Sequence, residues 1–396
     1  MTPDAEETAI ENQAIDNLGL QLEGNLGLPF TAGNQVEVLK NGTRIFPRML
    51  EAIQNARESI EFLTYIYWGG EVAQRFADAL SARAAEGVRV RVLLDAWGAK
   101  PIPETLLKQM RDAGADVRWF RPMRRWQIWK ADNRTHRKVL ICDNRDAFTG
   151  GVGIASVWEG DARGPNEWRE THLAVQGPAI HGLRGAFLSN WAATGKPGFE
   201  PGEAIHAVPA NAGTLRVQIL RATGADSWND MATLMHLLVS QARQRLRITS
   251  PYFVPNKQLK NLLVDAAQRG VEVQILVPGP YHDQAVSQYA GQADFADLLS
   301  AGVRIWRYQP TMLHAKVITV DGVLGSVGSA NFNQRSMRKD DEINLTALGE
   351  AFAAKLDDDF EQDLADSQEI SLADWQKRGW KIRFLEWACQ FIRPQT

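Results

Sequence analysis

One short pattern occurs twice in this chain, once in each half. A histidine is followed two positions later by a lysine, five positions after that by an aspartate, and then by a glycine. The residues are His136, Lys138, Asp143 and Gly150 in the first copy, and His314, Lys316, Asp321 and Gly328 in the second. A His-Lys pair repeated at fixed spacing indicates a duplicated folding unit. It predicts one phosphate-handling site built from both halves of the chain.

The spacing has a simple physical meaning. Each pair adjoins a short apolar run, VLIC or VITV, that predicts a buried strand. Because side chains alternate along a strand, a histidine and a lysine two positions apart share a face. The odd offset from the lysine would turn Asp143 and Asp321 to the opposite face, so we interpret them as mainly structural anchors. Ser329 and Asn331, again two apart, return to the face of the site.

These motifs resemble the signature of the phospholipase D superfamily, which is H-x-K-x4-D followed by G-S-x-N, present twice. The second copy matches fully, with Gly328, Ser329 and Asn331. The first copy has glycine where the signature has serine and asparagine, at Gly151 and Gly153. This form, together with the stretch WRETH at 168–172, is similar to bacterial cardiolipin synthases, above all to short ones without N-terminal transmembrane helices.

The resemblance implies an α/β fold of two tandem, similar domains. Each would be a mainly mixed β-sheet flanked by helices, with the active site at a pseudo-twofold interface. The sequence supports this, since strand and helix patterns recur in both halves and a Pro- and Gly-rich stretch separates them. The expected segments are a flexible acidic arm (1–33), a first domain (34–195), a linker (196–213), a second domain (214–370) and an aromatic and basic tail (371–396).

The resemblance also implies roles for residues. One histidine would form a phosphohistidine and the other would act as acid and base; His136 would be the nucleophile and His314 the acid/base, with the reverse left open by the pseudo-symmetry. The expected catalytic set is His136, Lys138, Asp143, Glu170, His314, Lys316, Asp321 and Glu342. The expected substrate-binding set is Gly150, Gly151, Gly328, Ser329, Asn331 and Asn333.

Neither a cofactor nor a metal is expected, because the two lysines supply positive charge around the phosphate. Glu170 and Glu342 are each a candidate partner for one histidine. Four aromatic residues end corresponding strands and either line the site or belong to the core: Tyr65, Tyr67, Tyr252 and Phe253.

The implied activity is a phosphatidyl transfer that makes cardiolipin from two phosphatidylglycerol molecules and releases glycerol. Water in place of the acceptor alcohol would instead make a phospholipase D-type hydrolase of phospholipid, or less readily of nucleic acid. A non-catalytic membrane-binding module is a third alternative, but the intact histidines and lysines argue against it. The net charge of -3 gives no basic field for nucleic acid, so none is expected as a partner. No obligate protein partner can be inferred.

The expected location is the cytoplasmic side of the cell membrane, with peripheral attachment. The chain has two cysteines, an acidic start unlike a signal peptide, and no apolar stretch of the roughly 18 residues needed to span a bilayer. In the tail, aromatic residues share one helical face among interspersed cations: Trp380, Phe384, Trp387 and Phe391. This face predicts contact with an anionic membrane surface, the alternative being a helix that packs on the protein's own body.

Overall fold

The structure is a computed structural model that describes residues 3–122, 133–198, 207–224 and 229–390. After helix α1 (Pro3–Leu26), the first half alternates strands and helices. Its elements are β1 (Thr31–Lys40), α2 (Gly42–Asn55), β2 (Ser59–Thr64), α3 (Glu71–Ala85), β3 (Arg89–Asp95), α4 (Glu104–Asp112), β4 (Asp116–Phe120), β5 (Val139–Cys142), β6 (Asp146–Gly150), the 3-10 turn η2 (Ser156–Trp158), β7 (Thr171–Gln176) and α5 (Ile180–Ala192).

The second half repeats this order. Its elements are β8 (Leu215–Ala222), α6 (Asp230–Gln241), β9 (Arg245–Thr249), α7 (Lys257–Gln268), β10 (Glu272–Pro278), α8 (Ala285–Gln292), α9 (Phe295–Ser300), β11 (Arg304–Tyr308), β12 (Val317–Val320), β13 (Leu324–Gly328), α10 (Gln334–Arg338), β14 (Glu342–Leu348) and α11 (Glu350–Ala365). The described part ends with β15 (Ser367–Glu369), α12 (Leu372–Gln376) and α13 (Trp380–Gln390). Asparagine side chains cap α6, α7 and α10 by accepting a backbone N–H of the first turn.

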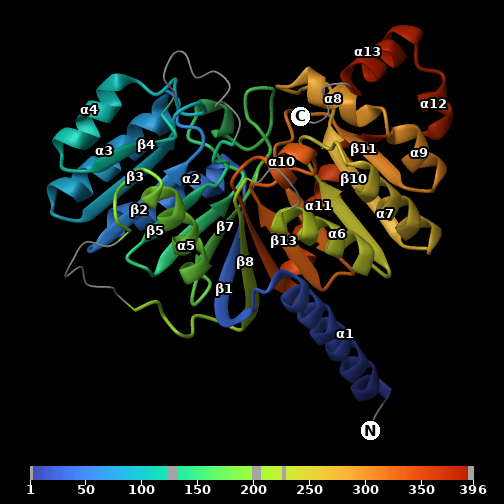
Figure 1. The fold of residues 1–396 in the computed structure, drawn as a ribbon, viewed down its shortest axis with the longest axis horizontal. Helices are drawn as coiled ribbons and strands as arrows, with labels where there is room; N and C mark the ends of the chain where they lie inside the picture. Colours follow the sequence, from blue (N-terminus) through green and yellow to red (C-terminus); the bar gives the residue numbers. More distant parts are fainter. Residues whose placement is uncertain (1–2, 123–132, 199–206, 225–228, 391–396) are drawn as a thin grey trace.

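All the strands join in one mixed sheet with the order β15-β11-β10-β9-β12-β13-β14-β8-β1-β7-β6-β5-β2-β3-β4. In the first half β2, β3 and β4 run parallel, whereas β5, β6, β7 and β1 pair antiparallel. The second half has the same pattern and meets the first where β1 pairs with β8 (Figure 1). The prediction of two similar α/β halves with mixed sheets is confirmed, and the two sheets are in addition continuous.

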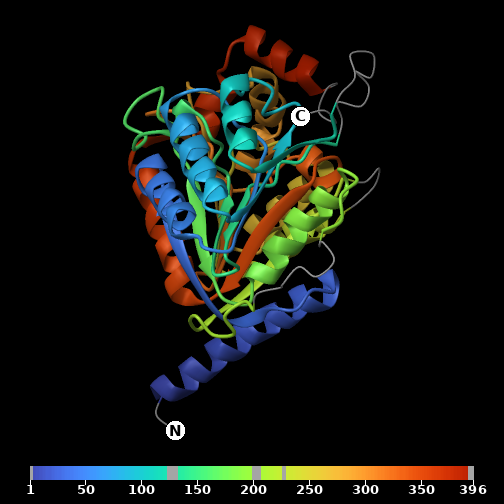
Figure 2. The ribbon, with the colours of Figure 1, turned by 90° about the vertical axis from the view of Figure 1, so that its left-hand side faces the viewer.

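The three largest apolar clusters among the described residues pack against this sheet. One lies under α2, α3 and α4 of the first half, and a second lies under α6, α7 and α9 of the second half. The third spans the junction, where α5 and α11 cover strands of both halves (Figures 1 and 2). This shared core fixes one half relative to the other, as a site at their interface requires.

The described part of the segment expected as a flexible arm, 1–33, is helical over most of its length. Residues 3–26 form a helix whose last part docks on the second half beside α6, and the helix extends from the body in Figures 1 and 2. Leu18, Leu22 and Leu26 are buried at spacings of four, so they form one apolar stripe. Because acidic and polar residues surround these leucines in the sequence, the composition did not indicate an apolar stripe. The first domain also begins earlier than expected, since β1 starts at Thr31.

Residues 196–213, expected as the linker, lie between α5 and β8, and 199–206 of them fall outside the described residues. The expected tail contains α12 and α13, and its predicted contact residue Phe391 also lies outside the described part. None of the described helices is both long enough and apolar enough to cross a bilayer.

Candidate active site

The two His-Lys pairs lie where the motif strands begin. We expected the histidine and lysine to belong to the strand itself, but β5 starts at Val139 and β12 at Val317, directly after each lysine. The segment that carries each histidine and lysine is extended but is not part of the motif strand, because its backbone pairs with the other half of the chain. The backbone N–H of His136 donates to Asp341 O (2.9 Å), and that of His314 donates to Arg169 O (2.8 Å).

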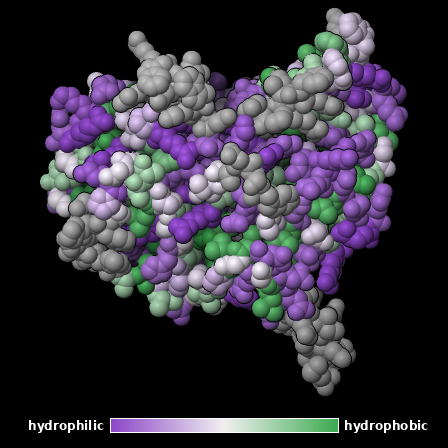
Figure 3. Space-filling model, viewed as in Figure 1, coloured by the Kyte–Doolittle hydropathy of each residue, from purple (hydrophilic) through white to green (hydrophobic). Residues whose placement is uncertain are grey.

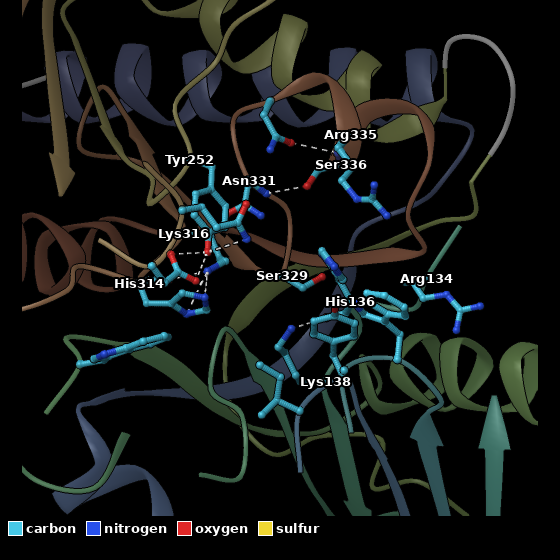
Figure 4. A pocket seen from close by; sticks show the side chains of 18 of the residues that line it. Arg134, His136, Lys138, Tyr252, His314, Lys316, Ser329, Asn331, Arg335 and Ser336 are labelled. Atoms are coloured by element: carbon cyan, nitrogen blue, oxygen red, sulfur yellow. Dashed lines mark hydrogen bonds between the residues drawn. The ribbon is translucent and has the colours of Figure 1, made fainter. Parts of the chain in front are cut away.

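Both pairs nevertheless line one cavity of about 510 Å³ at the junction of the halves. Figure 4 shows His136 and Lys138 on one side of it and His314 and Lys316 on the other. Each lysine curls back on its motif, because its Nζ donates to the carbonyl of the preceding histidine, at 2.7 Å for Lys138 and 2.5 Å for Lys316. Two ammonium groups therefore flank a space that can hold a phosphodiester.

Each histidine faces a carboxylate from the opposite half. The Nδ1 atom of His314, in the second half, lies 2.5 Å from Oε2 of Glu170, in the first half. The Nδ1 atom of His136 lies 3.3 Å from Oε1 of Glu342, in the second half. Both carboxylates are fully buried. A carboxylate at Nδ1 leaves Nε2 for chemistry and steadies the ring. The predicted partners are therefore brought together, crosswise between the halves.

The two carboxylates differ in what else they bind. Glu342 accepts hydrogen bonds from the hydroxyls of Ser329 (2.5 Å) and Ser336 (2.7 Å). Glu170 has a glycine, Gly151, at the position that corresponds to Ser329, and a Cβ there would lie 2.5 Å from Oε1 of Glu170. Glu170 thus occupies the space that a serine would take, and besides its histidine it accepts the backbone N–H of Thr171 at 2.9 Å. The contact between Glu170 and its histidine is the shorter of the two.

Burial shifts the pKa values of this site. Burial, helped by the charge of Lys316, lowers the pKa of His314 to about 4 although Glu170 opposes the shift. Burial and the like charge of Lys138 lower the pKa of Lys316 to about 7, again against Glu170. Burial alone would raise the pKa of Glu170, but His314 and Lys316 together lower it. Burial thus disfavours the charged forms of His314 and Lys316, and an anionic substrate in the cavity would favour them.

The three predicted polar substrate contacts all line the cavity, but they differ in availability. The hydroxyl of Ser329 is turned toward Glu342, and Oδ1 of Asn333 accepts from the backbone N–H of Ser336 as a helix cap. The Oδ1 atom of Asn331 is buried and has no hydrogen-bond partner among the described residues. Asn331 is thus the member of the three best able to accept a hydrogen bond from a ligand.

Asp143 and Asp321, included in the catalytic set, do not line the cavity; they follow the far ends of β5 and β12. Asp143 accepts from the backbone N–H groups of residues 57, 58 and 59 at 2.8–2.9 Å, and Asp321 does the same for residues 243, 244 and 245 at 2.8–3.2 Å. Both have φ of 53°, in the left-handed region where aspartate is tolerated. They anchor the start of the neighbouring strand, as their odd offset predicted.

The predicted substrate-binding glycines are also outside the cavity lining. A Cβ on Gly328 would lie 2.2 Å from Oδ1 of Asn344, and a Cβ on Gly150 would lie 2.8 Å from Thr171 O. Their role is close approach between neighbouring strands, which carries Glu170 and Glu342 next to the motifs.

The aromatic lining was only partly predicted. Tyr65 and Tyr252 line the cavity, whereas Tyr67 and Phe253 are buried in the core. Sequence reasoning missed Trp158, whose ring centroid lies 5.3 Å from that of His314. A tryptophan inside a 3-10 turn has no periodic signal that would mark it. Trp168 also has no periodic signal, and the sequence marks it only as part of WRETH. Its ring centroid lies 5.4 Å from that of His314.

Sequence reasoning also missed Asp340. Its Oδ2 lies 3.6 Å from Nε2 of His136, and with Glu342 it brings three possible metal-ligand atoms within 4.8 Å of one another. Arg335 already holds Asp340, with Nε at 2.7 Å from Oδ2. The two serine hydroxyls hold Glu342, so both carboxylates have protein donors where a cation would bind. The acidic run DDE, which leads into β14, is the sequence signal for Asp340.

Comparison with known proteins agrees with this geometry. A family profile described as "Cardiolipin synthase, PLD-like domain" matches residues 49–157 and 235–364, which contain both motifs. A cardiolipin synthase of Geobacillus sp. (strain WCH70) is 32% identical over 382 residues, covering 95% of this chain and 75% of the relative.

The chain belongs to the cardiolipin synthase family of phospholipase D-like proteins. The major cardiolipin synthase ClsA of Bacillus subtilis (strain 168) is 31% identical over 372 residues, covering 92% of this chain and 76% of that protein. Among solved structures, phosphatidylserine synthase of Haemophilus influenzae Rd KW20 has a TM-score of 0.71 at 17% identity and covers 95% of this chain and 99% of its own. At that identity the likeness concerns the fold. The predicted membership is therefore confirmed.

Proposed function

We propose that this protein transfers a phosphatidyl group between two phosphatidylglycerol molecules and so makes cardiolipin. The observation that carries the proposal is the pairing of two His-Lys motifs around one cavity, each histidine held by a buried carboxylate of the other half. The relatives called cardiolipin synthases supply the choice of lipid.

In the first step, Nε2 of His136 attacks the phosphorus of one phosphatidylglycerol. The bond from phosphorus to the glycerol headgroup breaks, and protonated His314 gives its proton to the departing alkoxide. Lys138 and Lys316 offset the charge that gathers on the phosphoryl oxygens. In the second step, His314 takes a proton from the glycerol hydroxyl of a second phosphatidylglycerol. That oxygen attacks, the phosphorus–nitrogen bond breaks, and cardiolipin leaves.

The difference between the two carboxylates supports this division of roles. Glu170 lies close to Nδ1 of His314, and a close buried carboxylate stabilises the imidazolium that an acid/base must form. A phosphodiester between the lysines adds a negative charge beside His314 and moves its lowered pKa back up. Glu342 shares its charge with two serines, which suits a neutral, attacking His136.

Transfer at a membrane surface is part of the proposal. On α13 the side chains of Trp380, Phe384 and Trp387 are exposed by 74%, 56% and 55%. Figure 3 shows a mainly hydrophilic face with scattered hydrophobic areas. Trp97, 52% exposed, lines the cavity itself. Aromatic side chains are favoured at the interface of a bilayer, so these residues suit contact with lipid.

The test is product analysis. The protein and its His314→Ala variant are incubated with phosphatidylglycerol vesicles, and lipids are identified by mass spectrometry. We expect cardiolipin and glycerol from the unaltered protein and neither from the variant. Phosphatidic acid without cardiolipin would replace the proposal by a phospholipase D-type hydrolase. No turnover of phosphatidylglycerol would reject both.

A further inference from the structure

A second cavity of about 490 Å³ lies in the second half, outside the site described above. It is bounded by α8, the loop before α8, the edge strand β15 with its neighbour β11, and α12, which Figure 1 draws at the upper right. The side chains that matter here are His282, Gln288, Arg307, Gln309, Trp375 and Arg378.

Two guanidinium groups meet at one indole in this cavity. The Cζ atoms of Arg307 and Arg378 lie 5.3 and 4.6 Å from the ring centroid of Trp375. Contact with the face of an aromatic ring holds a guanidinium in place while leaving its N–H edge available. The tryptophan thus orders both cations at the wall of the cavity.

The buried carboxylate beside these two arginines, that of Glu386, is taken up by Arg378. Glu386 of α13 is 3% exposed, and Arg378 takes both of its oxygens, with Nε at 2.9 Å from Oε1 and Nη2 at 2.8 Å from Oε2. The Nε atom of Arg307 is buried and has no hydrogen-bond partner among the described residues. Burial lowers the pKa of Arg307, opposed by Glu386 and Tyr289. A desolvated cation without a full counter-charge is costly unless a ligand supplies one.

The other acids at this cavity are already engaged. Glu369 pairs with Arg304, whose Nε lies 2.8 Å from its Oε1. Asp374 faces Lys377 at 3.6 Å and accepts from the hydroxyl of Ser371. The cavity therefore keeps an excess of positive charge centred on Arg307.

We propose that this cavity binds the phosphate of an anionic phospholipid headgroup through Arg307. Two parallel N–H groups of a guanidinium match two phosphate oxygens. His282, Gln288 and Gln309 also line the cavity and can hydrogen-bond to headgroup hydroxyls. The choice of phosphatidylglycerol as the lipid rests on the proposed function; the phosphate chemistry does not.

The location fits a lipid that is presented from a membrane. Glu386, which pairs with Arg378, belongs to the helix whose outer face exposes Trp380, Phe384 and Trp387. One loop separates this cavity from the active site, because Pro280 and His282 line the second cavity while Asp283 and Gln284 line the first. A headgroup at Arg307 would therefore lie beside the reacting lipids.

The test is a binding stoichiometry. Calorimetric titration with monomeric dihexanoyl phosphatidylglycerol uses the His314→Ala background, which prevents turnover. The active site takes its two lipids in successive steps and so counts as one site. We therefore expect two sites per chain, and one site when Arg307→Met is added. Arg44→Met, an exposed arginine on α2, removes the same charge elsewhere and should leave two sites. Inorganic phosphate is titrated in parallel.

Loss of one lipid site with Arg307→Met but not with Arg44→Met supports the proposal. A phosphate site that also depends on Arg307 identifies free phosphate as a sufficient ligand, and its absence identifies the lipid headgroup. A single lipid site in the chain that retains Arg307 overturns the second site and leaves the proposed function standing. No lipid site at all overturns both. Counting the lipid sites in the chain that retains Arg307 tests the proposal even if the Arg307→Met variant fails to fold.

Discussion

Glu170 and Glu342 occupy corresponding places but hold their histidines differently. The distance from Nδ1 is 2.5 Å at His314 and 3.3 Å at His136. A glycine in one motif and a serine in the other accompany this difference. The difference supports the separate roles proposed for the two histidines.

A substitution of Glu170 tests this asymmetry. Glu170→Gln keeps the size of the side chain and removes the charge that stabilises an imidazolium at His314. We expect kcat to fall by about 100-fold or more, the usual range for acid–base catalysis, with little change in KM. Glu342→Gln should cost less, because two serines already share that carboxylate. Initial rates of cardiolipin formation measure both, with the exposed Glu51→Gln as control. Equal losses in the two variants would contradict the assigned roles.

The lowered pKa of Lys316 gives a pH prediction. Below pH of about 7 the ammonium is charged and attracts the phosphodiester; above it the proton is lost, although a free lysine would keep its proton to about 10.5. We therefore expect kcat/KM to fall more steeply once pH rises above about 7. Lys316→Arg stays charged, so its lower activity should lack this alkaline limb. An identical limb in both pH profiles would assign it to another group.

At the level of elements, the two motif aspartates fix turns and not chemistry. Asp143→Ala removes the acceptor of three backbone N–H groups at the start of β2. Hydrogen bonds to a charged group contribute about 1.5–3 kcal/mol when buried, and partial exposure here reduces the expected total loss to about 2 kcal/mol. The urea midpoint should drop while activity per folded molecule persists below the transition. Asp112→Ala, at an exposed ion pair, should change stability by less than about 0.5 kcal/mol. A folded but inactive Asp143→Ala would return the residue to the catalytic set.

The exposed face of α13 gives a second prediction for a single element. Replacing Trp380, Phe384 and Trp387 by serine removes its largest exposed apolar side chains. We expect flotation with phosphatidylglycerol vesicles to fall several-fold, since burial of such side chains in the interface drives binding. Hydrolysis or transfer of short-chain lipid in solution should persist. Leu20→Ser on α1, 62% exposed, is the matched control. Unchanged flotation of the triple variant would reject α13 as the contact.

Local patterns predicted elements well where one periodicity acts alone. The apolar runs of the motifs are strands, and the histidines and lysines share one cavity. The strands begin after the lysines because the histidine-containing segment before each strand pairs with the other half of the chain. No local sequence pattern reveals this pairing. The leucine stripe of α1 is diluted by acidic residues, so its burial depends on contact with α6. Trp158 and Asp340 reach the site through irregular segments and left no periodic signal.

At the scale of the whole molecule, each half contributes contacts to the catalytic motif of the other half. Each His-x-Lys segment pairs with the other half, and each histidine uses the other half's carboxylate. The repeat predicts two similar halves, but a repeat alone cannot tell whether each half completes its own site. The joined sheet and the shared core under α5 and α11 decide it, because they fix the halves as one body. We therefore expect activity to depend also on groups that hold this junction without lining the cavity.

Arg137, between the histidine and lysine of the first motif, is the clearest such group. It is 1% exposed and donates to the carbonyls of Glu342 (3.2 Å) and Ala222 (2.8 Å) in the second half and to Asn190 Oδ1 (2.6 Å) in α5. Burial lowers its pKa to about 10, so it stays charged at pH 7. The second motif has Ala315 at this position, so the clamp is not part of the repeated chemistry.

Arg137→Met fills similar space but leaves these buried acceptors without a donor. Removing one partner of a buried charged network costs about 3–5 kcal/mol, so we expect a large drop of the urea midpoint. Activity per folded molecule should also fall. Arg137 holds the backbone carbonyl of Glu342, and without that contact the carboxylate of Glu342 would no longer be fixed beside His136. Arg145→Met, at an exposed ion pair, controls for loss of charge and should change neither quantity appreciably. If the midpoint drops while kcat stays constant, Arg137 joins the halves without setting the histidine. Unchanged stability would mean that the shared core alone holds the junction.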